Sequence, residues 1–113
     1  MSAITTHVLD TARGCPAEGI RVSLEQLDAL DTWKPIAQSA TDRDGRVPTL
    51  MPAGAPAIPG TYRLTFATGP YFETLGIPAF YPVVIVTFTV ESEPHYHVPL
   101  LLSPFGYSTY RGS

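Results

Sequence analysis

Apolar and polar residues alternate along much of this 113-residue chain, a pattern typical of β-strands that bury one face and expose the other. Ile20, Val22 and Leu24, for example, are each followed by a charged or polar residue. The same period of two, with β-branched and aromatic residues, predicts strands over eight ranges. These are 4–9, 20–25, 33–40, 46–50, 61–67, 83–90, 96–102 and 107–110.

Turn-forming residues separate the predicted strands. The sequence Thr-Asp-Arg-Asp-Gly over 41–45 predicts a tight turn, because glycine adopts a positive φ and aspartate side chains cap their own backbone. Residues 28–31 predict a hairpin-like connection, residues 51–60 a long Pro/Ala/Gly loop, and residues 71–76 a single helical turn. Many short strands at near-regular spacing are typical of an all-β sandwich.

Size and composition favour a single domain over residues 1–113. A chain of this length buries a core without disulfides or metal. Charged residues make up only 15% of it, so much of the surface is uncharged, which favours contacts between subunits. The net charge of -3 and the absence of basic clusters argue against nucleic acid or an anionic membrane as a partner.

Cysteine usage and hydropathy bear on the cellular compartment. The single cysteine, Cys15, allows no intramolecular disulfide and is interpreted as a small loop residue beside Pro16. The longest apolar run, 82–90, contains threonines and has the length of a strand rather than of a membrane span. The first ten residues lack the basic region and apolar stretch of a signal peptide, which predicts a cytoplasmic protein.

His95 and His97 lie two positions apart on a predicted strand, so both side chains point to the same face. Tyr96 and Val98 belong to the apolar face of that strand, and the histidines therefore point away from the core. Two interpretations stay open from the spacing alone. The pair is either two ordinary surface histidines or two ligands of a zinc site, for which His7 is the only further histidine.

His7 and Arg46 are the other candidates for chemistry. If Ile4 and Val8 point into the core, the alternation of the first strand turns His7 outward. Arg46 follows the tight turn and begins a short predicted strand. It is either a solvated surface residue or a clamp for a planar anion, because its rigid fork of donors matches such a group.

Several motifs together carry a resemblance to a known family. They are His-Val-Leu-Asp-Thr-Ala-Arg-Gly-Cys-Pro-Ala at 7–17, Thr-Asp-Arg-Asp-Gly-Arg at 41–46, Tyr-Arg-Leu-Thr-Phe at 62–66, Tyr-Phe-Glu-Thr-Leu-Gly-Ile-Pro-Ala-Phe-Tyr-Pro at 71–82 and the ending 95–113 with Tyr-Ser-Thr-Tyr-Arg-Gly-Ser. Essentially the whole chain resembles the transthyretin-like family. Its ending is similar to that of the 5-hydroxyisourate hydrolases, whereas transthyretins proper bind hormone and lack the histidines and the Tyr-Arg-Gly-Ser ending.

The resemblance implies a transthyretin-like sandwich of two four-stranded sheets with one short helix, assembled as a homotetramer, a dimer of dimers. It further implies that the strands bearing His7, Arg46 and His97 lie in one sheet, whose outward face lines a channel between dimers. The implied activity is hydrolytic opening of the six-membered ring of 5-hydroxyisourate to 2-oxo-4-hydroxy-4-carboxy-5-ureidoimidazoline in urate degradation. No metal or organic cofactor is implied.

The resemblance also implies residue roles. His7 and His97 would activate water and deliver a proton, with His95 a weaker match to the catalytic position. Histidine suits both tasks because its ordinary pKa, about 6.5, lies near neutrality. Arg46 would bind and orient the substrate and stabilise developing oxyanion charge.

The last residues would close the site. Tyr110 would stack on or hydrogen-bond the substrate, and Ser113 would contribute its hydroxyl or the terminal carboxylate. Arg111 would either contact the substrate or hold the terminus in place, and the whole segment could instead be a subunit contact.

Three other classes of protein compete with a hydrolase. A non-catalytic carrier of a small aromatic ligand is the main alternative, although a hydrophobic carrier gains little from three polar groups in its channel. A metal-binding protein would use His7, His95 and His97. A structural sandwich of the immunoglobulin type would have no task for the polar face.

Overall fold

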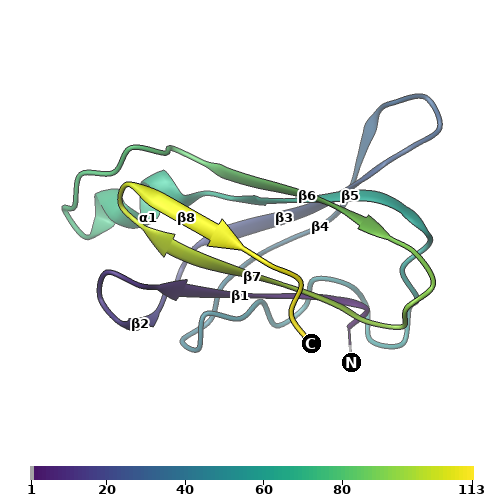
Figure 1. The fold of residues 1–113 in the computed structure, drawn as a ribbon, viewed down its shortest axis with the longest axis horizontal. Coiled ribbons are helices and arrows are strands. Elements are labelled where there is room, and N and C mark those ends of the chain that lie inside the picture. The colour runs from purple at the N-terminus through teal and green to yellow at the C-terminus, as the bar shows by residue number, and fades with distance from the viewer. Residues whose placement is uncertain (1) are drawn as a thin grey trace.

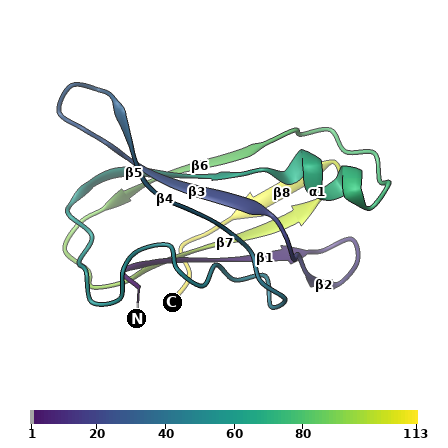
Figure 2. The same cartoon turned by 180° about the vertical axis from the view of Figure 1, so that it is seen from behind.

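Two four-stranded sheets lie face to face in the computed structural model, which describes residues 2–113 (Figures 1 and 2). The first sheet has the order β2-β1-β7-β8. Its strands are β1 (Ile4–Asp10), β2 (Cys15–Pro16), β7 (Tyr96–Ser103) and β8 (Gly106–Thr109). This sheet joins the two ends of the chain, because β1 pairs in parallel with β7.

The second sheet is built from the middle of the chain and is antiparallel throughout, in the order β4-β3-β5-β6. Its strands are β3 (Arg21–Leu27), β4 (Trp33–Ala40), β5 (Gly60–Phe66) and β6 (Val84–Val90). The helix α1 (Thr68–Thr74) follows β5 and lies at one end of the sandwich (Figure 1). The predicted all-β sandwich of two four-stranded sheets with one short helix is confirmed.

Apolar side chains from the inner faces of both sheets form one core. Tyr96, Val98, Leu100 and Leu102 of β7 are all at most 7% exposed, which confirms the face of this strand that the alternation predicted. Ile4 of β1 is fully buried in the same core. Strand parity therefore determines which side chains remain on the outer faces.

The predicted strand over 46–50 is wrong. Arg46 forms only an isolated bridge with His7, and the residues after it run irregularly. Val47 and Leu50 are both buried, a spacing of three that a flat strand does not produce, and Pro48 between them has no N–H to donate to a ladder. The strands that carry His7 and His97 lie in one sheet, as the resemblance implies. Arg46 is not on a strand of that sheet and is attached to it by the bridge alone.

Other element boundaries differ in smaller ways. The two-residue strand β2 contains Cys15, which the sequence pattern places in a loop. The helix begins three residues before the predicted helical turn. Pro70 does not prevent this, since it falls in the first turn, where proline is tolerated. None of the helical residues that the structure describes belongs to a segment long and apolar enough to cross a membrane.

A buried carboxylate fixes the end of β1. Asp10 is fully buried, and its carboxylate accepts hydrogen bonds from the backbone N–H of Arg13 at 3.0 Å and from the hydroxyl of Tyr71 at 2.8 Å. Burial and the bond to Asp10 raise the pKa of Tyr71 to about 12, so this hydroxyl keeps its proton at neutral pH. The helix is thereby tied to the strand that carries His7.

Removing this donor should destabilise the protein. We expect Tyr71→Phe to lower the free energy of unfolding by about 1–3 kcal/mol, because the buried Asp10 carboxylate loses one of its donors. Urea unfolding measures the change. Tyr107→Phe, at a ring that is 43% exposed, is the matched control and should have almost no effect. Equal stability of the two variants would contradict the structural role of the Asp10–Tyr71 bond.

Candidate active site

Two histidines occupy the outer face of neighbouring strands. β1 and β7 run parallel and side by side (Figure 1), in a register that places Thr5 opposite His97 and His7 opposite Pro99. Val98 beside His97 is buried, whereas both imidazoles are half-buried. The two histidines therefore face away from the core, as the alternation predicted.

Arg46 reaches the same face along the free edge of β1. It bridges His7, and residues opposite each other in a bridge point to the same side. The preceding Gly45 accepts a hydrogen bond from the N–H of Val8 at 2.8 Å and has a φ of 76°. A Cβ at Gly45 would overlap the carbonyl oxygen of Val8. Only glycine fits, so the tight turn determines where Arg46 lies.

A threonine hydroxyl connects the second histidine to a third. Oγ1 of Thr5 lies 2.8 Å from Nδ1 of His97 and 2.9 Å from Nε2 of His95. The two rings are nearly parallel, with an angle of 19° between their planes and centroids 6.4 Å apart. His97 thus uses Nδ1 inside the protein and keeps Nε2 for another partner.

The C-terminal segment folds back onto His97. The N–H of Gly112 donates to the carbonyl oxygen of His97 at 2.8 Å. A Cβ at Gly112 would lie 2.6 Å from Cδ2 of this imidazole, so the backbone of the segment packs directly on the ring. Ser113, the next residue, is exposed and lies close to the predicted site.

Tyr110 and Arg111 lie at a different place. Both line a hollow at the open edge of the sandwich, between β6 and β8. The guanidinium of Arg111 stacks over the ring of Tyr96, 4.9 Å from its centroid, and Tyr96 projects from β7 on the side opposite His97. The structure therefore does not bring Arg111 to the histidines within this subunit, and the roles of both residues stay predictions.

The surroundings of His97 lower the pKa of its imidazole. Burial lowers its pKa below the ordinary value, and the charges of His95, His7 and Arg46 lower the pKa further. A hydrogen bond with the backbone of Thr5 opposes this shift. A neutral imidazole with one free nitrogen can accept a proton from water, and the nearby guanidinium can bind an anion.

A metal centre is not supported by the placement of these residues. Among residues 2–113 there is no group of three or more His, Cys, Asp or Glu side chains placed to hold a metal ion. Nε2 of His95 and Nδ1 of His97 both lie within hydrogen-bond distance of the hydroxyl of Thr5.

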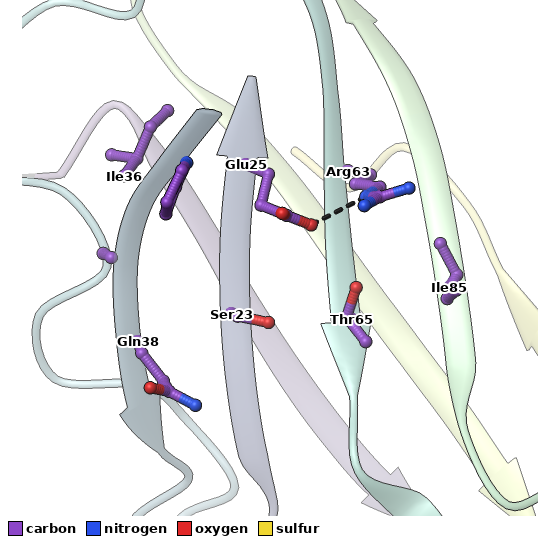
Figure 3. Close-up of a pocket in the computed structure, with 9 residues that line it drawn as sticks. Ser23, Glu25, Ile36, Gln38, Arg63, Thr65 and Ile85 are labelled. Carbon is purple, nitrogen blue, oxygen red and sulfur yellow. Dashed lines mark hydrogen bonds and ion pairs between the residues drawn. The ribbon is translucent and has the colours of Figure 1, made fainter. Parts of the chain in front are cut away.

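The outer face of the other sheet has different chemistry (Figure 3). A hollow across β3, β4, β5 and β6 includes Glu25, Arg63 and Ile85. The guanidinium of Arg63 donates to the carboxylate of Glu25 at 2.7 Å and stacks on Trp33. The charged groups of Arg63 and Glu25 thus pair with each other. The hollow contains none of the predicted site residues.

Comparison with known proteins identifies the family. A model described as the HIUase/Transthyretin family matches residues 4–112. The chain belongs to this family. Among its relatives, the 5-hydroxyisourate hydrolase of Mus musculus is 48% identical over 114 residues, which cover 99% of this chain and 96% of the mouse protein.

Solved structures within the family share the fold across two functions. The 5-hydroxyisourate hydrolase of Klebsiella pneumoniae has a TM-score of 0.85 at 37% identity and covers 99% of this chain and 100% of its own. The transthyretin of Sparus aurata has a TM-score of 0.90 at 32% identity, with 99% and 97% covered. The backbone therefore does not distinguish hydrolase from transthyretin, and the outward side chains must.

Thr5 is the residue near the histidines that the sequence interpretation did not single out. Its parity on the first strand, the same as that of His7, is a signal that places it on the outer face. Its position opposite His97 depends on the parallel register between strands about ninety residues apart, which no local pattern contains.

The pKa of His97 is directly testable. We expect its imidazole to titrate below 6.5, the ordinary value, because burial and the facing charges disfavour the protonated form. NMR measurement of the ring signals against pH gives the midpoint. Arg46→Gln should raise the midpoint by removing one positive charge, while Arg21→Gln, on the other sheet, should leave it unchanged. A midpoint at or above 6.5 would refute this account of the electrostatics.

Proposed function

We propose that this chain hydrolyses 5-hydroxyisourate, opening its six-membered ring to give 2-oxo-4-hydroxy-4-carboxy-5-ureidoimidazoline in urate degradation. The observation that carries the proposal is the convergence of His7, His97 and Arg46 on one outward sheet face, beside the folded-back C-terminal segment. The near-50% identity to the mouse hydrolase supports the same activity. No cofactor enters the proposed chemistry.

The reaction adds water to a ring carbonyl and breaks the adjacent C–N bond. One imidazole accepts a proton as the water oxygen bonds to the carbonyl carbon. A proton is then delivered to the departing ring nitrogen, and the former carbonyl becomes a carboxylate. His7 and His97 supply these two proton transfers, and the lowered pKa of His97 keeps it in the neutral, proton-accepting form at neutral pH.

Arg46 holds the planar, partly anionic substrate through its fork of donors and stabilises the oxyanion that develops on the attacked carbonyl. Its position on the edge of β1, fixed by the bridge to His7, orients the substrate toward the imidazoles. Ser113 closes the site, and Arg111 on Tyr96 holds the terminus in place. Tyr110 lies apart from the histidines of its own chain and would close a site only across a contact between subunits.

A homotetramer completes the proposal. The outward face of the β2-β1-β7-β8 sheet would then line a channel between two dimers. Tyr110 and Tyr107 are 58% and 43% exposed on or beside the edge strand β8, and assembly would cover such rings. The low proportion of charged residues is consistent with extensive subunit contacts.

A coupled assay tests the function. Urate oxidase generates 5-hydroxyisourate from urate in the cuvette, and the decay of its ultraviolet absorbance is followed with and without the protein. We expect accelerated decay, reduced by about 10²- to 10⁴-fold in kcat for His97→Asn, because a positioned acid or base contributes that factor. His7→Asn and Arg46→Ala should also lose most turnover.

Arg43→Ala is the matched control for Arg46, because it removes an exposed guanidinium from the same turn. This variant should retain full turnover. Decay at the spontaneous rate with a folded tetramer would refute the hydrolase and favour the small-ligand carrier, which predicts saturable binding without product.

A further inference from the structure

The hydroxyl of Thr5 lies within hydrogen-bond distance of two imidazoles. It is 2.9 Å from Nε2 of His95 and 2.8 Å from Nδ1 of His97, while the ring centroids are 6.4 Å apart. We propose that Thr5 and His95 are positioning residues for His97. Together they determine whether Nε2 of His97, the nitrogen left free for the substrate, carries a proton. This inference rests on the proposed hydrolase function and deepens it.

Proton counting limits the arrangements of this triad. A hydroxyl has one proton to donate and lone pairs to accept with, and a neutral imidazole has one N–H and one bare nitrogen. To bond both rings, the hydroxyl of Thr5 must donate to one nitrogen and accept from the other. Of the two nitrogens that face Thr5, one is therefore protonated and the other is bare, so the states of His95 and His97 are linked.

The two arrangements give His97 opposite chemical roles. If Nδ1 of His97 donates to Thr5, then Thr5 donates to Nε2 of His95, and Nε2 of His97 is bare and acts as a base. If Nε2 of His95 donates instead, Thr5 donates to Nδ1 of His97, whose Nε2 then carries a proton and acts as an acid. In converting the first arrangement into the second, the two protons of the triad move toward His95, Nε2 of His97 gains a proton, and Nδ1 of His95 releases one, so the net charge is unchanged.

The fold holds the three groups in this geometry. The parallel register places Thr5 directly opposite His97, and a β-branched side chain has few χ1 rotamers. From the other side, the backbone of Gly112 packs on the His97 ring, so closely that a Cβ there would lie 2.6 Å from Cδ2. The imidazole therefore cannot turn away from Thr5 without displacing the C-terminal segment.

The charges around His97 make such a linkage useful. The groups facing its ring are His95, His7 and Arg46, and each disfavours the protonated form of His97. A site that needs a base and later an acid cannot keep the imidazolium for long in these surroundings. An exchange of tautomers through Thr5 supplies either form of His97 while the ring stays neutral.

The first experiment uses the unaltered protein. It is made at about pH 8, and two-bond ¹H–¹⁵N correlation NMR reports which nitrogen of each ring is protonated. We expect one proton on the pair formed by Nε2 of His95 and Nδ1 of His97. Protons on both facing nitrogens, or on neither, would overturn the linkage.

The second experiment separates positioning from packing. Thr5→Val keeps the shape and strand preference of the side chain but removes the hydroxyl, and Thr5→Ser keeps the hydroxyl. We expect Thr5→Val to lower kcat by about 2- to 10-fold, the factor that one neutral hydrogen bond represents, with KM unchanged and the protonation of His95 and His97 no longer linked. Thr5→Ser should restore most of kcat and the linkage.

Two further variants complete the design. His95→Phe keeps a planar ring without nitrogens and should resemble Thr5→Val, with the same loss in kcat. Thr65→Val removes an outward threonine hydroxyl from β5 of the other sheet and is the matched control, with unchanged kcat, pH profile and histidine spectra.

The outcomes distinguish this inference from the proposed function. No turnover by the unaltered protein would refute the hydrolase, while the NMR result would still decide the linkage. Full kcat in Thr5→Val, in an active enzyme, would overturn the positioning role and leave the hydrolase in place. A loss in kcat that Thr5→Ser does not restore would mean that Thr5 acts through packing, which also overturns the proposal.

Discussion

The parallel pairing of β1 with β7 is the constraint on which the site depends. Seven residues of each strand are in register, from Ile4 opposite Tyr96 to Asp10 opposite Leu102. Because side chains alternate across a sheet, a slip by one residue would turn the outward histidine of one strand into the core. The buried residues of both strands oppose such a slip, so the hydrophobic core and the catalytic geometry are specified by the same pairing.

Much of the fold could be read from local patterns, because strand parity depends only on neighbouring residues. Parity correctly placed His7 and His97 outward and Tyr96 inward. It failed for residues 46–50, where Val47 and Leu50 enter the core three positions apart and Pro48 interrupts a ladder. The resemblance to a family added the number of strands in each sheet, which no short-range pattern contains.

The site itself was only partly predictable. Its charged and titratable members belong to residue types that are few in this chain and typical of catalytic sites. Thr5 gives no such signal, because an outward threonine on a strand is common. Its role follows from contact with residues about ninety positions away. Arg111 shows the converse, since a motif names it but the fold turns its side chain onto Tyr96.

The same long separation between paired strands has a consequence for the order of folding. The strands β3, β4, β5 and β6 pair with near neighbours and can form their antiparallel sheet during synthesis. β1 is made first, yet it acquires its central partner only after about ninety more residues, roughly 5 to 20 seconds later at ordinary rates of translation. During that interval the edge of β1 that later pairs with β7 offers unpaired backbone groups. One sheet of the nascent chain is thus complete while β1 still lacks its partner β7.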